Sequence, residues 1–199
     1  MIKKNILMLY FASLSLFGKT QIPVLRSNTS NTEKEASVIF KNFSGQYDFI
    51  ISFTRESYWW GNKRFFWILG HKQDHWEKLF LSEKQKKNSE WSKPVISKEE
   101  FNQNNADSIV NFFNQNRFWE LNRDSLNINQ REIDDKKNQV FSISDAVNYK
   151  FEILSKQEFL IIACYAPEHF LEKIPEIKCR EVFIRCRDFF ISQLKKTNN

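Results

Sequence analysis

Two stretches of the chain alternate between apolar and polar side chains, and this pattern limits the fold more than any other feature. In the first stretch, aromatic or aliphatic residues stand at every second position: Tyr47, Phe49, Ile51 and Phe53. The second stretch repeats the pattern with Val147, Tyr149, Phe151 and Ile153. A period of two is typical of a β-strand with one buried face. We therefore expect a sheet with at least two amphipathic strands.

Further strands are predicted around these two. Turn residues near Gly61 and Gly70 separate the runs 64–69 and 75–81, which predicts a three-stranded antiparallel meander. Val38–Phe43 is interpreted as an additional, earlier strand. Phe159–Tyr165 follows the second alternating stretch after a short polar break, so the two form a hairpin. Because this last run is almost continuously apolar, we expect a central strand covered on both faces.

Helices are predicted in three places. Ser97 and Glu100 have the spacing of a capping box, which indicates a helical segment there. A second helix is expected from Ala106 to Asn116, capped by Asn105, and a third from about Ile177 to Leu194. Residues 122–139 lack any such periodicity and are interpreted as a long exposed loop. The fold class is therefore α+β: an antiparallel β-meander and a β-hairpin form one sheet, with two main helices packed on one face.

The N-terminus resembles an export signal. Lys3 and Lys4 precede an uncharged apolar run of 12 residues, Ile6–Phe17, and small residues Gly18 and Thr20 follow it. This is the layout of a secretory signal peptide, and the run is shorter than the roughly 20 residues that cross a bilayer. We predict a signal peptide over 1–20 with cleavage near Thr20, a disordered N-terminal tether over 21–35 and a single domain over 36–199. The protein would then be periplasmic or secreted, with no stable membrane insertion.

Charge and glycine content argue against several functional classes. Of the 30 basic residues, Lys3, Lys4 and Lys19 leave with the leader, so 27 basic residues face 24 acidic ones and the net charge falls from +6 to +3. We therefore expect no nucleic-acid partner. Only Gly45, Gly61 and Gly70 remain after cleavage. Phosphate-binding loops and nucleophile elbows need glycine, so we expect no nucleotide cofactor. The abundance of Asn, Lys, Ile and Phe favours a bacterial source with an A/T-rich genome.

The three cysteines allow two interpretations. Cys179 and Cys186 are seven residues apart on one predicted helix, about 10 Å along its axis, which is beyond disulfide reach. In an oxidising compartment, Cys164 could pair with either Cys179 or Cys186. Alternatively, all three are buried as small apolar residues. His71, Asp74 and His75 cluster at a predicted turn, where two histidines do not share a helical face, so we expect no metal site.

Two groups of residues are candidates for function. Glu168 and His169, beside Tyr165, could perform acid–base chemistry, although residues adjacent in sequence usually point apart. Tyr58, Trp59 and Trp60 are three consecutive aromatics at a predicted hairpin tip. Exposed, they would form a platform for sugar rings or a partner protein; otherwise some of them fold back onto the core.

These observations favour an exported bacterial binding or interaction domain without catalytic activity. Its partner would be an envelope protein or a glycan, contacted through Tyr58–Trp60 or an exposed sheet face. A small envelope hydrolase using Glu168, His169 and Tyr165 is the enzyme alternative. An inhibitor or immunity-type protein is a third hypothesis, in which surface complementarity matters more than a pocket.

Overall fold

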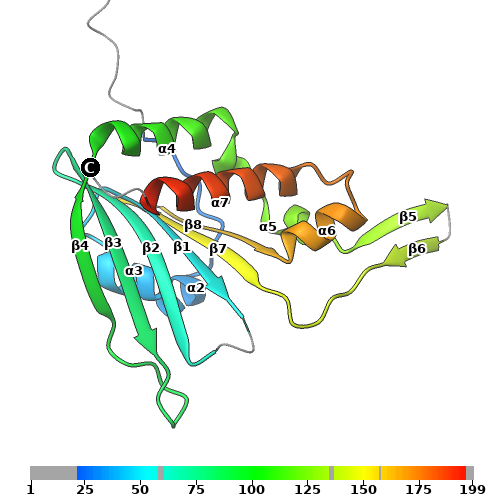
Figure 1. Ribbon diagram of the computed structural model, residues 1–199, viewed down its shortest axis with the longest axis horizontal. Coiled ribbons are helices and arrows are strands. Elements are labelled where there is room, and N and C mark those ends of the chain that lie inside the picture. The colour runs from blue at the N-terminus through cyan, green and yellow to red at the C-terminus, as the bar shows by residue number, and fades with distance from the viewer. Residues whose placement is uncertain (1–21, 58–60, 135–136, 157, 196–199) are drawn as a thin grey trace, which may run out of the picture.

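The structure is a computed structural model that describes residues 22–57, 61–134, 137–156 and 158–195. Its main element is a six-stranded antiparallel sheet with the strand order β4-β3-β2-β1-β7-β8 (Figure 1). Helices cover both faces of this sheet, and a two-stranded ribbon projects from one side. The α+β class and the single main sheet expected from the sequence are confirmed.

The first four strands form a meander. They are β1 (Phe49–Glu56), β2 (Lys63–Lys72), β3 (His75–Lys84) and β4 (Val95–Phe101). Gln73 and Asp74 connect β2 to β3, with φ of 48° and 66°. Two consecutive left-handed residues make the kind of tight turn whose twist matches that of a hairpin. Gly70 is needed in β2, because a Cβ there would lie 2.8 Å from the ring of Tyr47.

The second hairpin pairs β7 (Asn148–Ser155) with β8 (Phe159–Tyr165), and β7 lies beside β1. The prediction that the apolar run of β8 is a central strand is wrong, because β8 is at the edge of the sheet. Its side chains are nevertheless buried on both faces. Its outer backbone edge is hydrogen-bonded by two asparagines: Asn28 bonds both the N–H and the C=O of Ile161, and Asn127 accepts from the N–H of Tyr165. The edge therefore behaves like a paired strand.

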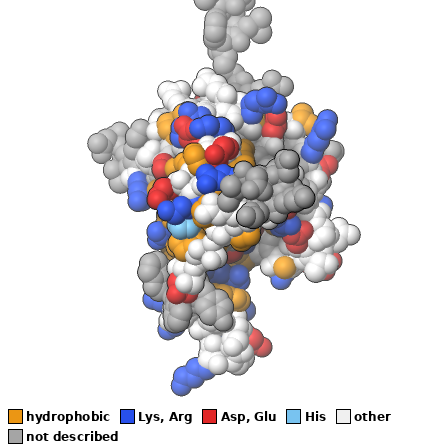
Figure 2. Space-filling model, turned by 90° about the vertical axis from the view of Figure 1, so that its right-hand side faces the viewer, with side chains coloured by type: hydrophobic (Ala, Val, Ile, Leu, Met, Phe, Trp, Pro, Cys, Tyr) orange, Lys and Arg blue, Asp and Glu red, His pale blue; other side chains and the backbone are white. Residues whose placement is uncertain are grey.

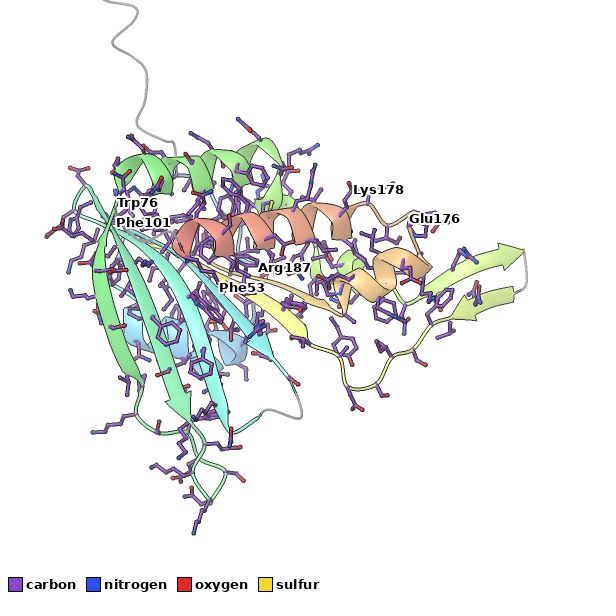
Figure 3. The ribbon with its side chains drawn as sticks, viewed as in Figure 1. Phe53, Trp76, Phe101, Glu176, Lys178 and Arg187 are labelled. Atoms are coloured by element: carbon purple, nitrogen blue, oxygen red, sulfur yellow. The ribbon has the colours of Figure 1, made fainter. Side chains whose placement is uncertain are left out.

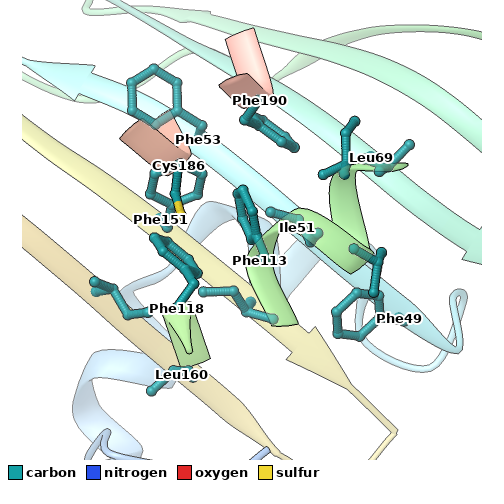
Figure 4. Close-up of a cluster of buried hydrophobic side chains, with 14 of the residues drawn as sticks. Phe49, Ile51, Phe53, Leu69, Phe113, Phe118, Phe151, Leu160, Cys186 and Phe190 are labelled. Atoms are coloured by element: carbon teal, nitrogen blue, oxygen red, sulfur yellow. The ribbon is translucent and has the colours of Figure 1, made fainter. Parts of the chain in front are cut away.

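The larger core lies between the sheet and two helices, α4 (Gln103–Gln115) and α7 (Cys179–Lys195). Figure 4 shows phenylalanines from both helices and from the strands meeting there, among them Phe53, Phe113, Phe151 and Phe190. Trp76 and Phe101 close this layer at the end of the sheet near the start of α4 (Figure 3). Both main helices thus pack on one face, as expected. Asn102 caps α4, three positions before the cap predicted from the sequence.

The other face carries α2 (Asn31–Ala36) and α3 (Val38–Phe43), so the prediction of a strand at 38–43 is wrong. Ser37 caps α3 with its hydroxyl, which turns Val38, Ile39 and Phe43 onto the sheet. Residues 22–35 also differ from the expected tether. Leu25 is buried, and the hydroxyls of Ser27 and Thr29 donate to the carbonyl of Phe159. The hydroxyls of Ser27 and Thr29 thus bond a carbonyl of the edge strand β8, which would otherwise be hydrogen-bonded to water.

Two further predictions are corrected by the structure. Ser97 and Glu100 do not cap a helix but lie in β4, because the segment pairs with β3 in regular register. Residues 122–139 are not one loop: they contain α5 (Arg123–Leu126), followed by the projecting ribbon β5 (Gln130–Asp134) and β6 (Lys137–Val140). A 3₁₀ turn, Phe118–Glu120, precedes α5, and α6 (Pro167–Lys173) precedes α7. Within the described ranges, no helix is both long and apolar enough to cross a bilayer.

Candidate functional site

The largest hollow of the described residues is a cavity of about 660 Å³ where β1 ends and β2 begins. We call it the end cavity. The strands β1 and β2, the chain after β3, the segment before β7 and the end of β8 all contribute to its wall. The side chains and backbone used below belong to Arg55, Glu56, Lys63, Arg64, Trp91, Asp145, Ala146, Asn148 and Tyr165.

Arg64 is the most firmly positioned cation of the end cavity. It lies directly opposite Glu83 in the β2–β3 register, and its Nε donates to the Glu83 carboxylate over 2.6 Å. Glu83 is buried, and the guanidinium lies over the ring of Trp91 with 4.0 Å to the centroid. The ion pair and the ring contact orient the planar group without using its two terminal nitrogens. Those nitrogens have no protein partner among the described residues.

Glu56, at the end of β1, also lines the end cavity and is held in place. Asn148, its register partner on β7, donates from Nδ2 to the Glu56 carboxylate over 3.1 Å. Lys150 contacts the same carboxylate over 2.5 Å. Glu56 is therefore already paired, whereas Arg55 and Lys63 have no ion-pair partner among the described residues. Arg55 lies over the ring of Trp67, and Asp145 adds a carboxylate to the same lining.

Tyr165 fixes the segment that closes the end cavity on the β7–β8 side. Its hydroxyl donates to the carbonyl of Ile143 and accepts from the N–H of Ala146, both over 3.2 Å. Between these two residues, Asp145 has a left-handed φ of 64°, which produces a sharp turn there. This turn places Asp145 and Ala146 at the cavity wall. Tyr165 therefore acts as a structural clamp in this site.

A second hollow of about 380 Å³ lies beside the end cavity, between α2 and the strands β7 and β8. We call it the α2 cavity. Lys150 bonds the buried Glu152 over 2.9 Å, and the hydroxyl of Ser37 donates to that carboxylate over 2.5 Å. Across the hollow, Arg123 pairs with Glu33 over 2.9 Å. Its walls also include Asn127, Asn148, Ala36, Ile161 and Ala163.

Lys150 is the electrostatic link between the two cavities. Burial disfavours its charged form, but the carboxylates of Glu152 and Glu56 outweigh burial and raise the pKa of Lys150 above its usual value. The ammonium therefore stays charged and forms an ion pair with each of the two carboxylates. Thr54, its neighbour on β1, and Ser52, the neighbour of Glu152, have buried hydroxyls on the same strip. A polar strip thus crosses β1 and β7 next to the apolar contact with α3.

The three residues predicted for acid–base chemistry do not form one site. Glu168 forms an ion pair with Arg187 over 2.5 Å, and Arg187 lies over the ring of Tyr149 on the α7 side of the sheet. His169 packs edge-on against Phe170. Of the three, only Tyr165 lines the end cavity, where both of its hydrogen bonds are to backbone. Glu168 and His169 are adjacent on one short helix, and such neighbours point in different directions.

The cysteines and histidines occupy structural positions. All three cysteines are free thiols, so neither of the two possible pairings of Cys164 is present. Burial raises the pKa of Cys164 and of Cys186 to about 12 in each case, which disfavours a thiolate nucleophile. His71 lies against Trp76, and His75 lies 3.6 Å from Glu77. In the part of the chain that the structure describes, no group of three or more His, Cys, Asp or Glu side chains is arranged to hold a metal ion.

The aromatic triplet Tyr58, Trp59 and Trp60 lies outside the described residues. The residues on either side of it, Ser57 and Gly61, line the end cavity. Sequence reasoning missed Arg64, Trp91, Lys150 and Glu152, which come from segments distant in sequence. One signal was available for β7: Lys150 and Glu152 are charged residues between apolar ones, on the face that the alternating pattern leaves polar.

Charge on the neighbouring surface is mixed. Viewed from the side on which α6 and the β5–β6 ribbon project, basic and acidic side chains are interspersed with apolar ones (Figure 2). Long-range attraction from a field of one sign is therefore weak on this face. Selection of a charged ligand would depend on individually placed groups such as Arg64. No protein-family model matches this chain, and a search of curated proteins finds no match.

Proposed function

We propose that this chain is an exported bacterial binding domain without catalytic activity, which holds a ligand carrying a carboxylate in the end cavity. The export signal predicted over 1–20 would deliver it to the periplasm or the medium after cleavage near Thr20. The ligand would be part of the envelope or its surroundings. The two anchored contacts of Arg64 carry this proposal.

Arg64 is suited to bind a carboxylate because it is already ordered. Its Nε is bonded to Glu83 and one face lies over Trp91, so little conformational entropy remains to be lost on binding. The terminal nitrogens present a planar pair of donors that matches the two oxygens of a carboxylate. Arg55 and Lys63 also contribute to the lining, with Arg55 lying over the ring of Trp67. A ligand anion would therefore meet one rigid donor pair at Arg64.

Binding is favoured over hydrolysis by the ion pairs of the nearby carboxylates. Glu56 and Glu152 both contact the Nζ of Lys150, over 2.5 and 2.9 Å. A pair of carboxyl groups performs glycosidic hydrolysis only when one of them keeps a proton to donate to the leaving group. Here both carboxylates are engaged by one lysine, so neither is free to approach a leaving group. This arrangement favours binding over cleavage at Glu56 and Glu152.

The proposal predicts stabilisation by small carboxylates. We would measure the melting temperature of the full chain with acetate, citrate, glutamate and glucuronate, against chloride at equal ionic strength. At a ligand concentration of about ten times Kd, a binding anion should raise Tm by about 3–5 °C. Arg64→Met combined with Glu83→Gln removes the donor pair without leaving a buried carboxylate unpaired, and should abolish the shift.

Arg117 and Glu120 provide a matched control. They form an exposed ion pair outside both cavities, and the double change Arg117→Met with Glu120→Gln should leave the shift intact. The proposal is wrong if none of the carboxylates stabilises the protein more than chloride does. It is also wrong if the Arg64 and Glu83 double variant responds to carboxylates as the parent does.

A further inference from the structure

The end cavity and the α2 cavity share Asn148, which lines both. Arg64 and Trp91 line the end cavity together with this residue, and Lys150 and Glu152 line the α2 cavity together with it. Glu152 and Asn148 are four residues apart on β7, which corresponds to about 13 Å along the strand. The two hollows therefore follow one another as a trough along the polar strip of the sheet, beside α2.

We propose that this trough binds an acidic oligosaccharide, with its carboxylate-bearing ring in the end cavity and a neutral part of the chain in the α2 cavity. This inference rests on the proposed function of the end cavity and names the class of its ligand. It is carried by three features of the α2 cavity: paired charges, amide groups and the absence of a free strand edge.

The charges of the α2 cavity cancel in pairs. Arg123 is bonded to Glu33, and Lys150 is bonded to Glu152. A second anion or a cation on the ligand would find no unpaired counter-charge here. Hydroxyl groups suit such a wall, because each can donate to a carboxylate and accept from a guanidinium, an ammonium or an amide. The α2 cavity is therefore matched to an uncharged, hydroxyl-rich group.

Small apolar surfaces alternate with these polar groups. Ala36, Ile161 and Ala163 line the same hollow, and Asn127 and Asn148 add amides that donate and accept. A sugar ring has polar edges and less polar faces, so it can contact both kinds of wall at once. At the other end of the trough, Trp91 and Tyr165 provide the larger aromatic surfaces. Both ends can thus accommodate a ring.

An extended peptide is the main competing ligand, but most of the strand edge beside the trough is already occupied. β7 is hydrogen-bonded on both sides, to β1 and to β8. The outer edge of β8 is used by Asn28 at Ile161 and by Asn127 at Ala163 and Tyr165. A peptide that binds by strand addition needs free backbone N–H and C=O groups. Most of these groups are already used along this part of the trough, which favours a ligand recognised by its hydroxyls.

The test compares ligands of increasing length on the full chain. Titration calorimetry would use galacturonate, its di- and longer oligomers, and the same oligomers with their carboxylates reduced to alcohols. We expect affinity to rise from the monomer to the longer acidic oligomers. Arg123→Met should lower affinity for the longer oligomers by about tenfold, the effect of one hydrogen bond to a charged group, and leave the monomer within about twofold.

The outcomes separate this inference from the proposed function. If galacturonate binds through Arg64 but affinity neither rises with length nor depends on Arg123, the end cavity binds its anion and the oligosaccharide inference is wrong. Tighter binding of an acidic peptide such as oligoglutamate than of any acidic oligomer overturns it as well. If no carboxylate binds in an Arg64-dependent manner, the proposed function itself fails. Arg117→Met serves as the control for loss of an exposed arginine.

Discussion

Replacement of Arg180 by methionine should destabilise the protein more than any surface change on the same helix. Arg180 is fully buried in α7, and among the described residues no carboxylate pairs with it; its guanidinium donates to backbone carbonyls instead. Nε donates to Leu126 over 2.9 Å, one terminal nitrogen to Phe170 over 3.1 Å and the other to Ile128. Methionine keeps the apolar stem and removes all three donors.

The size of the stability loss depends on which hydrogen bonds the three carbonyls keep after Arg180 is replaced. Leaving a buried acceptor without its partner costs about 1–3 kcal/mol. The carbonyl of Leu126 keeps a weak contact with the thiol of Cys164, and that of Phe170 still accepts from the N–H of Ile174. Ile128 is partly exposed, so water can replace the lost donor there. Removal of a buried charge also recovers desolvation free energy. We therefore expect a net loss of about 2–4 kcal/mol, below three full penalties.

Urea unfolding followed by tryptophan fluorescence and far-UV circular dichroism measures this loss. The corresponding fall in Tm is about 5–15 °C for a chain of this size. Arg185→Met is the control: Arg185 is exposed on the same helix and bonds the side chain of Asn116, so its loss should cost less than about 0.5 kcal/mol. Arg180→Lys, which keeps the charge but not the planar fork, should fall between the two. An Arg180→Met protein as stable as the Arg185→Met protein would refute this reasoning.

Two further changes test buried groups elsewhere. The hydroxyl of Tyr47 donates to Glu77 over 2.5 Å and lowers the pKa of that carboxyl. The hydrogen bond therefore stabilises the fold fully above the pKa of the unfolded chain, about 4.3. This stabilisation is lost as pH falls through the lower pKa of Glu77 in the folded protein. Tyr47→Phe should therefore cost about 1–2 kcal/mol at pH 7 and progressively less below pH 4, measured by urea unfolding at each pH; an equal loss at pH 7 and pH 3 would contradict this. Cys164 and Cys186 are buried thiols, and burial raises the pKa of each to about 12. Ellman's reagent should therefore modify them only after denaturant is added. Rapid labelling of either cysteine in the native protein would contradict their buried placement.

Most of the sheet could be predicted because its signals are local. The alternation of Phe49, Ile51 and Phe53 identifies the face of β1 that packs in the larger core, and no distant residue is needed to read it. The expectation of a single buried face is wrong, because the opposite face of β1 is buried too. The helix at 38–43 could not be identified in this way. Val38, Ile39 and Phe43 favour a strand by composition, but the hydroxyl of Ser37 caps a helical turn that packs them against the sheet. Tertiary packing outweighed intrinsic preference in that segment.

The edge position of β8 was missed for a related reason. A strand that is apolar on both faces is usually central, because both faces must be covered. Here α5 and the neighbouring helices cover the faces, while Asn28 and Asn127 satisfy the outer backbone. Asparagine side chains resemble a peptide group, so two of them replace part of a missing strand. The local sequence of 159–165 does not indicate that asparagine side chains take the place of a neighbouring strand, since Asn28 lies over 130 residues away.

The candidate site could not be predicted because its parts meet only through the strand register. Arg64 needs Glu83 on the next strand, and Lys150 on β7 needs Glu56 on β1, which is adjacent in the sheet but six strands earlier in the chain. One residue of slip in either pairing would move these charges to the apolar face. The α2 cavity also depends on a contact with α7. Arg180 donates to the carbonyls of Leu126 and Ile128, which flank the cavity residue Asn127. In the folded Arg180→Met protein, a ligand that occupies the α2 cavity should therefore bind with lower affinity. A ligand confined to the end cavity should keep its affinity.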